Sequence, residues 1–202
     1  MAIREMAKNA SCVIMFVLFC AIPGAWAEDS NTVLTEGYSI EAFGHFFNKI
    51  IHEKVYYGKK KSRIEIENSS IMIVRKDKNV IWTIIPKHKI YMEESFDKNQ
   101  SSLGIDDSKY KLTGTETING QLMDKYTADL SPAVGNKSQC KGILLVSKSS
   151  RTPIRGDLVC GTQTQTITEY KNAVIGDPPA DLFEIPEGYK KVSIAEFSAI
   201  HN

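Results

Sequence analysis

The chain has 202 residues, of which 42% are hydrophobic, 24% charged and 9% aromatic. This composition excludes a disordered or collagen-like polymer and is typical of a globular domain. Lysine and arginine number 25 against 24 acidic residues, so the overall charge does not indicate nucleic acid as a partner. A chain of this length buries roughly 70% of its unfolded surface, so size alone requires neither metals nor disulfides.

The first 27 residues have the pattern of a secretory signal peptide. Arg4 and Lys8 form a short basic region, an apolar run follows, and a small-residue cleavage motif ends at Ala27. The apolar run is shorter than the ~20 residues of a spanning helix, which disfavours the alternative of a retained anchor. We therefore expect a cleaved signal peptide over residues 1–27. Residues 28–202 should form one exported domain without a membrane span.

The mature chain retains two cysteines, Cys140 and Cys160. In an oxidising compartment two such thiols most simply form a disulfide. Closing a loop of this length contributes about 3 kcal/mol in the chain-entropy description. A metal or redox role is the alternative, and the sequence disfavours it because there is no Cys-x-x-Cys motif and no histidine nearby.

From residue 54 onward, stretches rich in Ile, Val, Tyr and Thr alternate with turn residues, which is typical of β-strands. Asn119-Gly120 lies between two such stretches and is a strong hairpin signal. The other connections are mostly too short for a parallel crossover, which favours antiparallel neighbours. The sequence thus predicts a mainly β fold with a meander-like sheet, whose strands are Lys54–Tyr57, Ser62–Glu67, Ser70–Lys76, Val80–Pro86, Ile90–Ser95, Tyr110–Ile118, Gln121–Leu130, Gly142–Lys148, Ile154–Cys160 and Gln165–Val174.

Four further segments are less regular. Residues 40–51 combine helical spacing with strand-like alternation, and Gly44 favours the strand interpretation because glycine weakens a helix. Residues 97–108 fit either a long loop or a short helix. Residues 178–183 indicate a helical turn that begins at proline, and residues 189–194 an extended piece.

Two neighbouring predicted strands, residues 71–74 and 80–85, are apolar on both faces. A sheet with one face in water should alternate apolar and polar residues instead. Left uncovered, such a patch would exceed what soluble monomers usually expose. Either a bound apolar ligand or partner covers part of it, or the N-terminal segment and loops pack there as an ordinary core.

A set of short motifs runs through the mature chain in a fixed order and spacing. They include Tyr57-Gly58-x3-Ser62-Arg63-Ile64-Glu65, Val74-Arg75-Lys76-Asp77-Lys78, Ile81-Trp82, Pro86-x4-Tyr91-Met92-Glu93, Gly114-Thr115-Glu116-Thr117-Ile118-Asn119-Gly120 and, most distinctive, Pro179-Ala180-Asp181-Leu182-Phe183-Glu184-Ile185-Pro186-Glu187-Gly188-Tyr189. Together they resemble a family of small exported bacterial proteins of uncharacterised function. That family is similar in fold to the LolA/LolB-like periplasmic carriers of outer-membrane lipoproteins, in which a strongly curved antiparallel sheet encloses an apolar cavity for acyl chains.

The resemblance implies a single strongly curved sheet, an incomplete LolA-like barrel with few short helices, located in the periplasm. Its concave face would hold a lipid, an acyl chain or a lipoprotein. Arg63 belongs to an Arg-x-Glu strand of the family, and the simpler interpretation of it is an outward ion pair with Glu65 or with an acid on a neighbouring strand. The residues expected to line the hydrophobic cleft are Met72, Val74, Trp82, Ile84, Tyr91 and Phe183.

Catalytic patterns are largely missing from the sequence. The four histidines, His45, His52, His88 and His201, lack metal-ligand spacing, and no serine lies in a Gly-x-Ser-x-Gly elbow. We therefore predict no enzymatic activity, no metal and no cofactor. The expected function is binding of a hydrophobic ligand as a carrier or envelope sensor. The alternative is a non-catalytic interaction module that binds another envelope protein.

Overall fold

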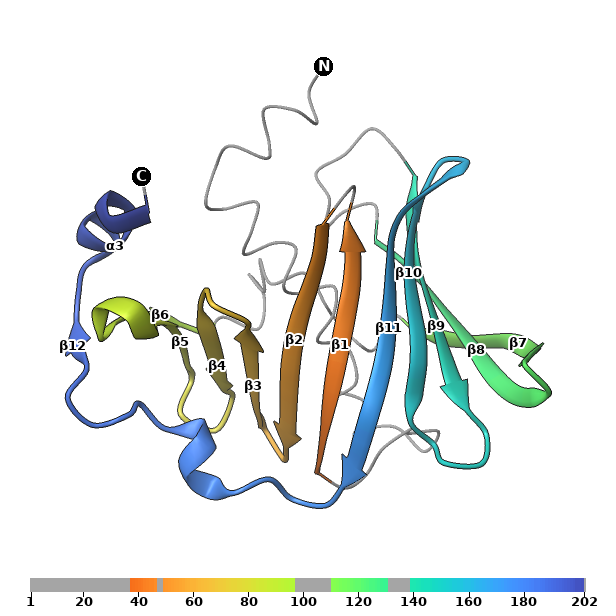
Figure 1. Cartoon of the computed structure of the whole chain (residues 1–202), viewed down its shortest axis with the longest axis horizontal. Coiled ribbons are helices and arrows are strands. Elements are labelled where there is room, and N and C mark those ends of the chain that lie inside the picture. Colours follow the sequence, from red (N-terminus) through yellow and green to blue (C-terminus); the bar gives the residue numbers. More distant parts are fainter. Residues whose placement is uncertain (1–36, 47–48, 97–109, 131–138, 202) are drawn as a thin grey trace.

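The computed structural model describes residues 37–46, 49–96, 110–130 and 139–201. Their strands form one curved sheet that does not close (Figure 1), with the order β12-β6-β5-β4-β3-β2-β1-β11-β10-β9-β8-β7. The predicted leader and the segment 97–108 lie outside the described residues. The strands are β1 (Tyr38–Phe46), β2 (Lys49–Gly58), β3 (Lys61–Ile66), β4 (Ile71–Arg75), β5 (Val80–Ile85), β6 (Ile90–Ser95), β7 (Lys111–Ile118), β8 (Gln121–Asp129), β9 (Cys140–Ser147), β10 (Pro153–Cys160), β11 (Gln163–Ile175) and β12 (Lys190–Lys191).

Two meanders make up the sheet. Strands β1 to β6 follow one another from the middle to one edge, and β7 to β11 follow one another from the opposite edge back to the middle. The two meanders join where β1 pairs antiparallel with β11, for example with Ala42 opposite Tyr170. The predicted mainly β, antiparallel and incompletely closed architecture is confirmed, with one parallel exception in the pairing of β12 with β6.

Residues 40–51, which the sequence left between strand and helix, belong to two strands rather than one. β1 and β2 pair antiparallel along their whole length, so the strand interpretation is confirmed and the helix is wrong. The alternation along this stretch places Ile40 and Ala42 in the core. Phe43 lies on the other face, where its ring stacks on His52.

After β11 the chain crosses the sheet to the far edge (Figure 1). We call residues 176–193 the C-terminal segment. It contains the predicted proline-started turn, now seen as the 3-10 helix η4 (Ala180–Phe183). The predicted extended piece, residues 189–194, shrinks to the two residues of β12, and helix α3 (Ile194–His201) begins at its last residue. Ser193 and Glu196 form the capping box that starts this helix.

The strands bury apolar residues on both faces, as the sequence predicts. The larger cluster defines what we call the inner face, and a smaller cluster under the C-terminal segment defines the outer face. The inner cluster consists of Tyr38, Ile40, Ala42, Val55, Ile64, Met72, Tyr110, Tyr126, Ala128, Leu130, Cys140, Leu144, Val146, Leu158 and Tyr170. The outer cluster consists of Ile73, Trp82, Ile84 and Phe183.

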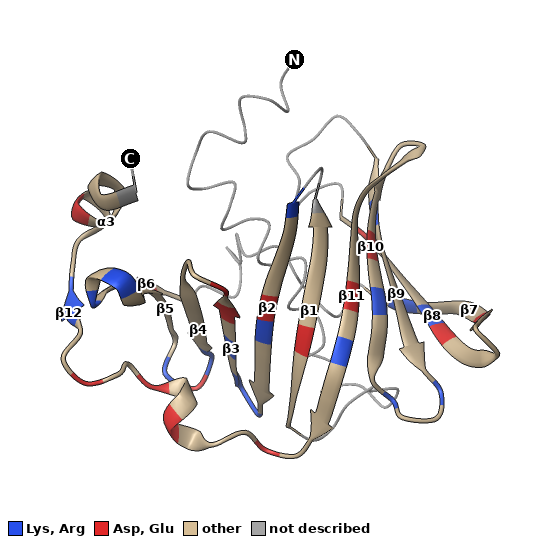
Figure 2. Ribbon diagram, in the orientation of Figure 1, with Lys and Arg blue, Asp and Glu red and all other residues tan. Residues whose placement is uncertain are grey.

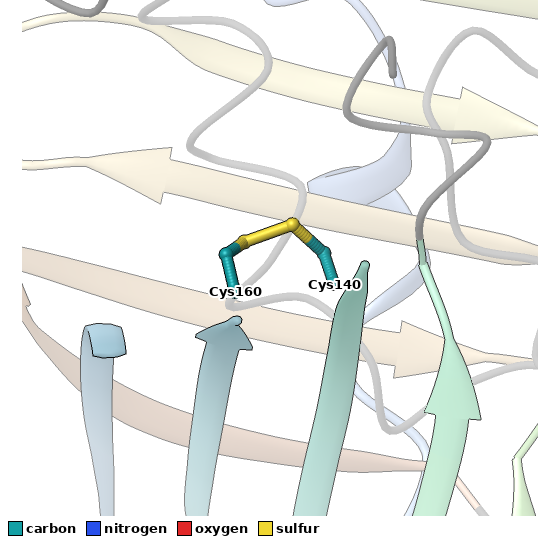
Figure 3. The surroundings of a disulfide bond; sticks show 2 residues. All are labelled: Cys140 and Cys160. Carbon is teal, nitrogen blue, oxygen red and sulfur yellow. A yellow bond between two sulfur atoms is a disulfide. The ribbon is translucent and has the colours of Figure 1, made fainter. Parts of the chain in front are cut away.

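The predicted disulfide is confirmed. Cys140 begins β9 and Cys160 ends β10, and the two residues lie directly opposite each other in the ladder. Their sulfur atoms are bonded, and the bond joins neighbouring strand ends (Figure 3). Cys140 also belongs to the inner cluster, so the disulfide lies at the edge of that core.

Candidate functional site

The inner face is the candidate binding surface, and aromatic side chains with polar tips are its main feature. Four of its buried residues are the tyrosines Tyr38, Tyr110, Tyr126 and Tyr170. A fifth, Tyr57, packs against the cluster and stacks on Tyr38 with the ring centroids 5.4 Å apart. Tyrosine combines a large apolar body with one hydroxyl, so this lining contacts apolar groups while keeping a few polar positions.

Two glycines make room for these rings. A Cβ at Gly142 would overlap the hydroxyl of Tyr110 and lie 2.9 Å from Leu130 Cδ1. A Cβ at Gly156 would lie 3.3 Å from the hydroxyl of Tyr170. The strands β9 and β10 therefore lack side chains at the two positions where the rings of Tyr110 and Tyr170 lie against them.

Polar side chains also occur on the inner face. Glu53, Thr166 and Thr168 are each almost completely buried. Ala42 lies opposite Glu53 on one side and opposite Tyr170 on the other, and these polar residues therefore belong to the central strands β2, β1 and β11. The sequence prediction missed this polar band, because one acid or threonine in an alternating strand is ordinarily assigned to solvent.

On the outer face, the C-terminal segment itself is the cover. Phe183 is completely buried and packs with Ile73, Trp82 and Ile84. The ammonium group of Lys61 lies 4.5 Å from the centroid of the Phe183 ring, a cation–π contact. The apolar patch predicted on this face is thus filled by the chain's own residues.

Two buried arginines fix this cover to the sheet. Arg63 donates to the carbonyl of Leu182 at 2.8 Å and to Glu65 at 2.7 Å, so the predicted ion pair with Glu65 is confirmed. Arg75 donates to the carbonyl of Phe183 at 3.0 Å and to the carboxylate of Glu184. Hydrogen bonds from a charged group are stronger than neutral ones, and they satisfy two backbone carbonyls in a largely buried place.

The carboxylates beside Arg75 are held in their ionised form. The two hydrogen bonds that Arg75 donates lower the pKa of Asp77 to about 2. For Glu184, burial raises the pKa, but hydrogen bonds from Lys78 and Arg75 outweigh it and the net pKa is lowered. At neutral pH the arginine therefore lies between two carboxylates, and Lys78 supplies a further positive charge.

The six residues predicted to line one cleft lie on two faces of the sheet. Met72 belongs to the inner cluster, and Val74 lies opposite Ile81, which packs against that cluster. The other four, Trp82, Ile84, Tyr91 and Phe183, pack together on the outer face. The structure therefore does not bring all six together. Only strand alternation, applied residue by residue, separates the two groups.

The outer group has polar anchors of its own. The indole N–H of Trp82 donates to Glu93 at 2.8 Å, and Lys191 of β12 donates to the same carboxylate at 2.6 Å. The hydrogen bonds from Lys191 and Trp82 lower the pKa of Glu93. The edge strand β12 is therefore linked through one carboxylate to the tryptophan beneath the C-terminal segment.

The histidines do not form a common site with Glu53. His52 lies on the outer face, 3.2 Å from Glu67 and 3.6 Å from Glu41, whereas Glu53 points to the inner face. His45 and His88 are exposed. In the part of the chain that the structure describes, no group of three or more His, Cys, Asp or Glu side chains is placed to bind a metal. The same part contains no helix with the length and hydrophobicity of a membrane span.

Neither a protein-family model nor a curated protein sequence matches the chain. Among solved structures, it is similar to an uncharacterized conserved protein from Thermus thermophilus, with 11% identity, a TM-score of 0.59, and coverage of 80% of this chain and 92% of that one. For the Pseudomonas aeruginosa MucA/MucB complex the identity is 9% and the TM-score 0.46, with coverage of 76% of this chain and 57% of that one. For the Mycobacterium tuberculosis lipoprotein LppX the identity is 13% and the TM-score 0.42, with coverage of 73% of this chain and 89% of that one. Of these three likenesses, the first shows a shared fold. The open, curved sheet is consistent with the LolA-like architecture that the sequence resemblance implies.

Proposed function

We propose that this protein is an exported, periplasmic and non-catalytic binding protein that holds a hydrophobic ligand on the inner face of its curved sheet. The ligand class is a lipid, an acyl chain or the acylated end of a lipoprotein, and the protein acts as its carrier or as an envelope sensor. The observation that supports this proposal is the tyrosine-rich apolar cluster that runs across the strands from β4 to β8.

The contrast between the two faces determines where the ligand should bind. The outer cluster is covered by the C-terminal segment and anchored by Arg63 and Arg75. A ligand there would have to break those hydrogen bonds and remove Phe183 from its site. On the inner face the proposed site includes Met72, Val74 and the tyrosines, and each buried methylene of an acyl chain contributes about 0.8 kcal/mol.

The first test is chemical. We expect organic extraction of the protein, purified from its native envelope, to release lipid that mass spectrometry detects. Purified, lipid-free protein should also bind dodecan-1-ol in calorimetric titration. A lipid-free preparation that takes up neither dodecan-1-ol nor a fluorescent fatty acid would contradict the proposal.

A pair of neighbouring variants locates the site. Ile81 and Val80 are adjacent on β5 and both half-buried, but Ile81 packs against the inner cluster and Val80 against the outer one. Ile81→Gln should weaken dodecan-1-ol binding several-fold, because it places an amide in the apolar site. Val80→Gln is the matched control and should leave the affinity unchanged. Equal losses in both variants would mean that the inner face is not the site.

A second candidate function, binding of another envelope protein, is favoured by strand β7. It is an edge of the sheet and is almost entirely exposed. Such an edge accepts an added strand from a partner. Thr115→Lys combined with Thr117→Lys should then abolish capture of a crosslinked envelope partner, because charges on an edge oppose pairing. If ligand uptake is absent and these changes abolish capture, the interaction function replaces lipid binding.

A further inference from the structure

Two turns at one end of the sheet bring several lysines together. The turn between β2 and β3 carries Lys59 and Lys60, and the turn between β4 and β5 carries Lys76. The backbone N–H of Lys76 donates to the carbonyl of Lys60 at 2.9 Å, so the two turns are in direct contact. Figure 2 shows the basic residues of these turns beside the acidic residues of the C-terminal segment.

The lysines divide between the two faces. Lys61 and Lys78 contact residues on the outer face. Lys61 lies over the Phe183 ring, and Lys78 donates to both carboxylate oxygens of Glu184. Lys76 lies on the inner side, two residues beyond Val74, and its ammonium group is 5.9 Å from the centroid of the Phe96 ring. The hydrogen bond from Lys76 places Lys60 beside it, and Lys59 precedes Lys60 in the same turn after the end of β2.

Lys59, Lys60 and Lys76 are all exposed, and none of them forms an ion pair with a carboxylate of the described residues. Glu94, on the same side of β6 opposite Ile81, does not pair with them either. The turn between β9 and β10 differs, because its Lys148 and Arg151 both pair with Asp124. Among the described residues, these three lysines therefore form a positively charged group without ion pairs at one end of the inner face.

We infer that the ligand is an anionic amphiphile whose carboxylate or phosphate is bound by Lys59, Lys60 and Lys76, with its tail on the inner face. This inference rests on the proposed function and adds to it the charge and the orientation of the ligand. Apolar residues and cations occur together at this end, since the Phe96 ring contacts Lys76, and Val74 and Tyr57 each lie two residues before one of the lysines. A neutral amphiphile would use the same apolar surface without the lysines.

Three probes that share one tail test the inference by calorimetric titration: dodecanoate, dodecan-1-ol and dodecyltrimethylammonium. Dodecanoate should bind roughly tenfold more tightly than dodecan-1-ol, since exposed ion pairs each contribute little and three act together. The cationic probe should bind least. The triple variant Lys59→Gln/Lys60→Gln/Lys76→Gln should reduce dodecanoate affinity to that of dodecan-1-ol and leave dodecan-1-ol unchanged.

The matched control changes three exposed lysines at the opposite end of the sheet: Lys49→Gln/Lys87→Gln/Lys89→Gln. It alters the net charge equally and should leave all three affinities unchanged. Equal binding of dodecanoate and dodecan-1-ol, or equal losses in both triple variants, would overturn the lysine inference alone. If none of the three probes binds, the proposed function falls as well.

A final experiment distinguishes binding of a single ligand molecule from binding to a membrane surface. Vesicles of phosphatidylglycerol present the same negative charge with their acyl chains already buried. If the Lys59/Lys60/Lys76 variant loses vesicle binding but keeps its preference for dodecanoate, the lysines serve a membrane surface and the inference is wrong. Loss of the dodecanoate preference in solution, without vesicles, supports it.

Discussion

The same strands bury apolar side chains on both faces, but by different means. On the outer face one continuous peptide covers a small cluster, and guanidinium groups bind its backbone carbonyls. On the inner face the cluster is wider, rich in tyrosine and interrupted by polar residues. Hydrogen bonds from buried arginines hold the outer cover in place, whereas the tyrosine-rich inner face is the surface where we propose that a ligand binds.

The largest effect is expected at the centre of the outer cluster. Phe183→Ala should lower the free energy of unfolding by about 3–5 kcal/mol, because it leaves a cavity where a completely buried ring was. Urea denaturation followed by circular dichroism measures this loss. Ile194→Ala, at a residue that is 62% exposed, is the control and should change little. A loss below about 1 kcal/mol at Phe183 would show that the C-terminal segment is not a permanent cover.

Removal of the disulfide probes the inner core. The double variant Cys140→Ala/Cys160→Ala should cost about 2–4 kcal/mol, because the unfolded chain regains the freedom of the closed loop. Denaturant titration of the variant, compared with the oxidised parent, gives the value. An unchanged midpoint would mean that the bond contributes nothing to the stability of the inner face.

The arginine anchor comes next in size. Arg75→Ala should cost roughly 1–3 kcal/mol, because the carbonyl of Phe183 loses its donor in a buried place. Arg75→Lys should restore only part of this, since an ammonium group cannot reproduce the paired hydrogen bonds to Asp77. Unfolding midpoints of the two variants and the parent decide the matter. Full rescue by lysine would mean that charge, rather than geometry, holds the cover.

The smallest effect is a pH dependence. The pKa of Asp77 is 3.8 in the unfolded chain and about 2 in the folded protein. The ion pair of Asp77 with Arg75 therefore contributes its full stabilisation of the folded state at pH values above 3.8. That stabilisation disappears as the pH falls through about 2. Because Asp77 is more than a third exposed, we expect it to amount to at most about 1 kcal/mol. Unfolding measured at pH 5 and near pH 2 should differ less in Asp77→Asn than in the parent protein.

Much of the fold follows from local signals. Alternating apolar residues and the Asn119-Gly120 turn predict the hairpins, and the two cysteines predict their own bond. The pairing of β1 with β11 has no such signal, because the partners are far apart in the sequence and either strand could have been an edge. Helix α3 does have a local signal, because Ser193-x-x-Glu196 is a capping-box pattern that marks the start of a helix.

The candidate site was harder to predict than the fold. Apolar residues on both faces of β4 and β5 correctly indicated that both faces are covered. Which segment covers each face depends on tertiary packing. The outer face is covered by a segment that lies more than a hundred residues after Ile73 in the sequence. The motifs around Arg63, Arg75 and Phe183 have a physical explanation in the structure. The two arginines on the sheet donate hydrogen bonds to the backbone of the segment that contains Phe183.

The pairing of β1 with β11 has a consequence for the order of folding. Each meander consists of hairpins between sequence neighbours, which close short loops and form quickly. The pairing of β1 with β11, which we call the seam, joins residues as distant as Tyr38 and Ile175. It can form only after nearly the whole polypeptide has been synthesised. Until then both halves carry a bare edge at the seam, and we expect the nascent chain to depend most on chaperones at that stage.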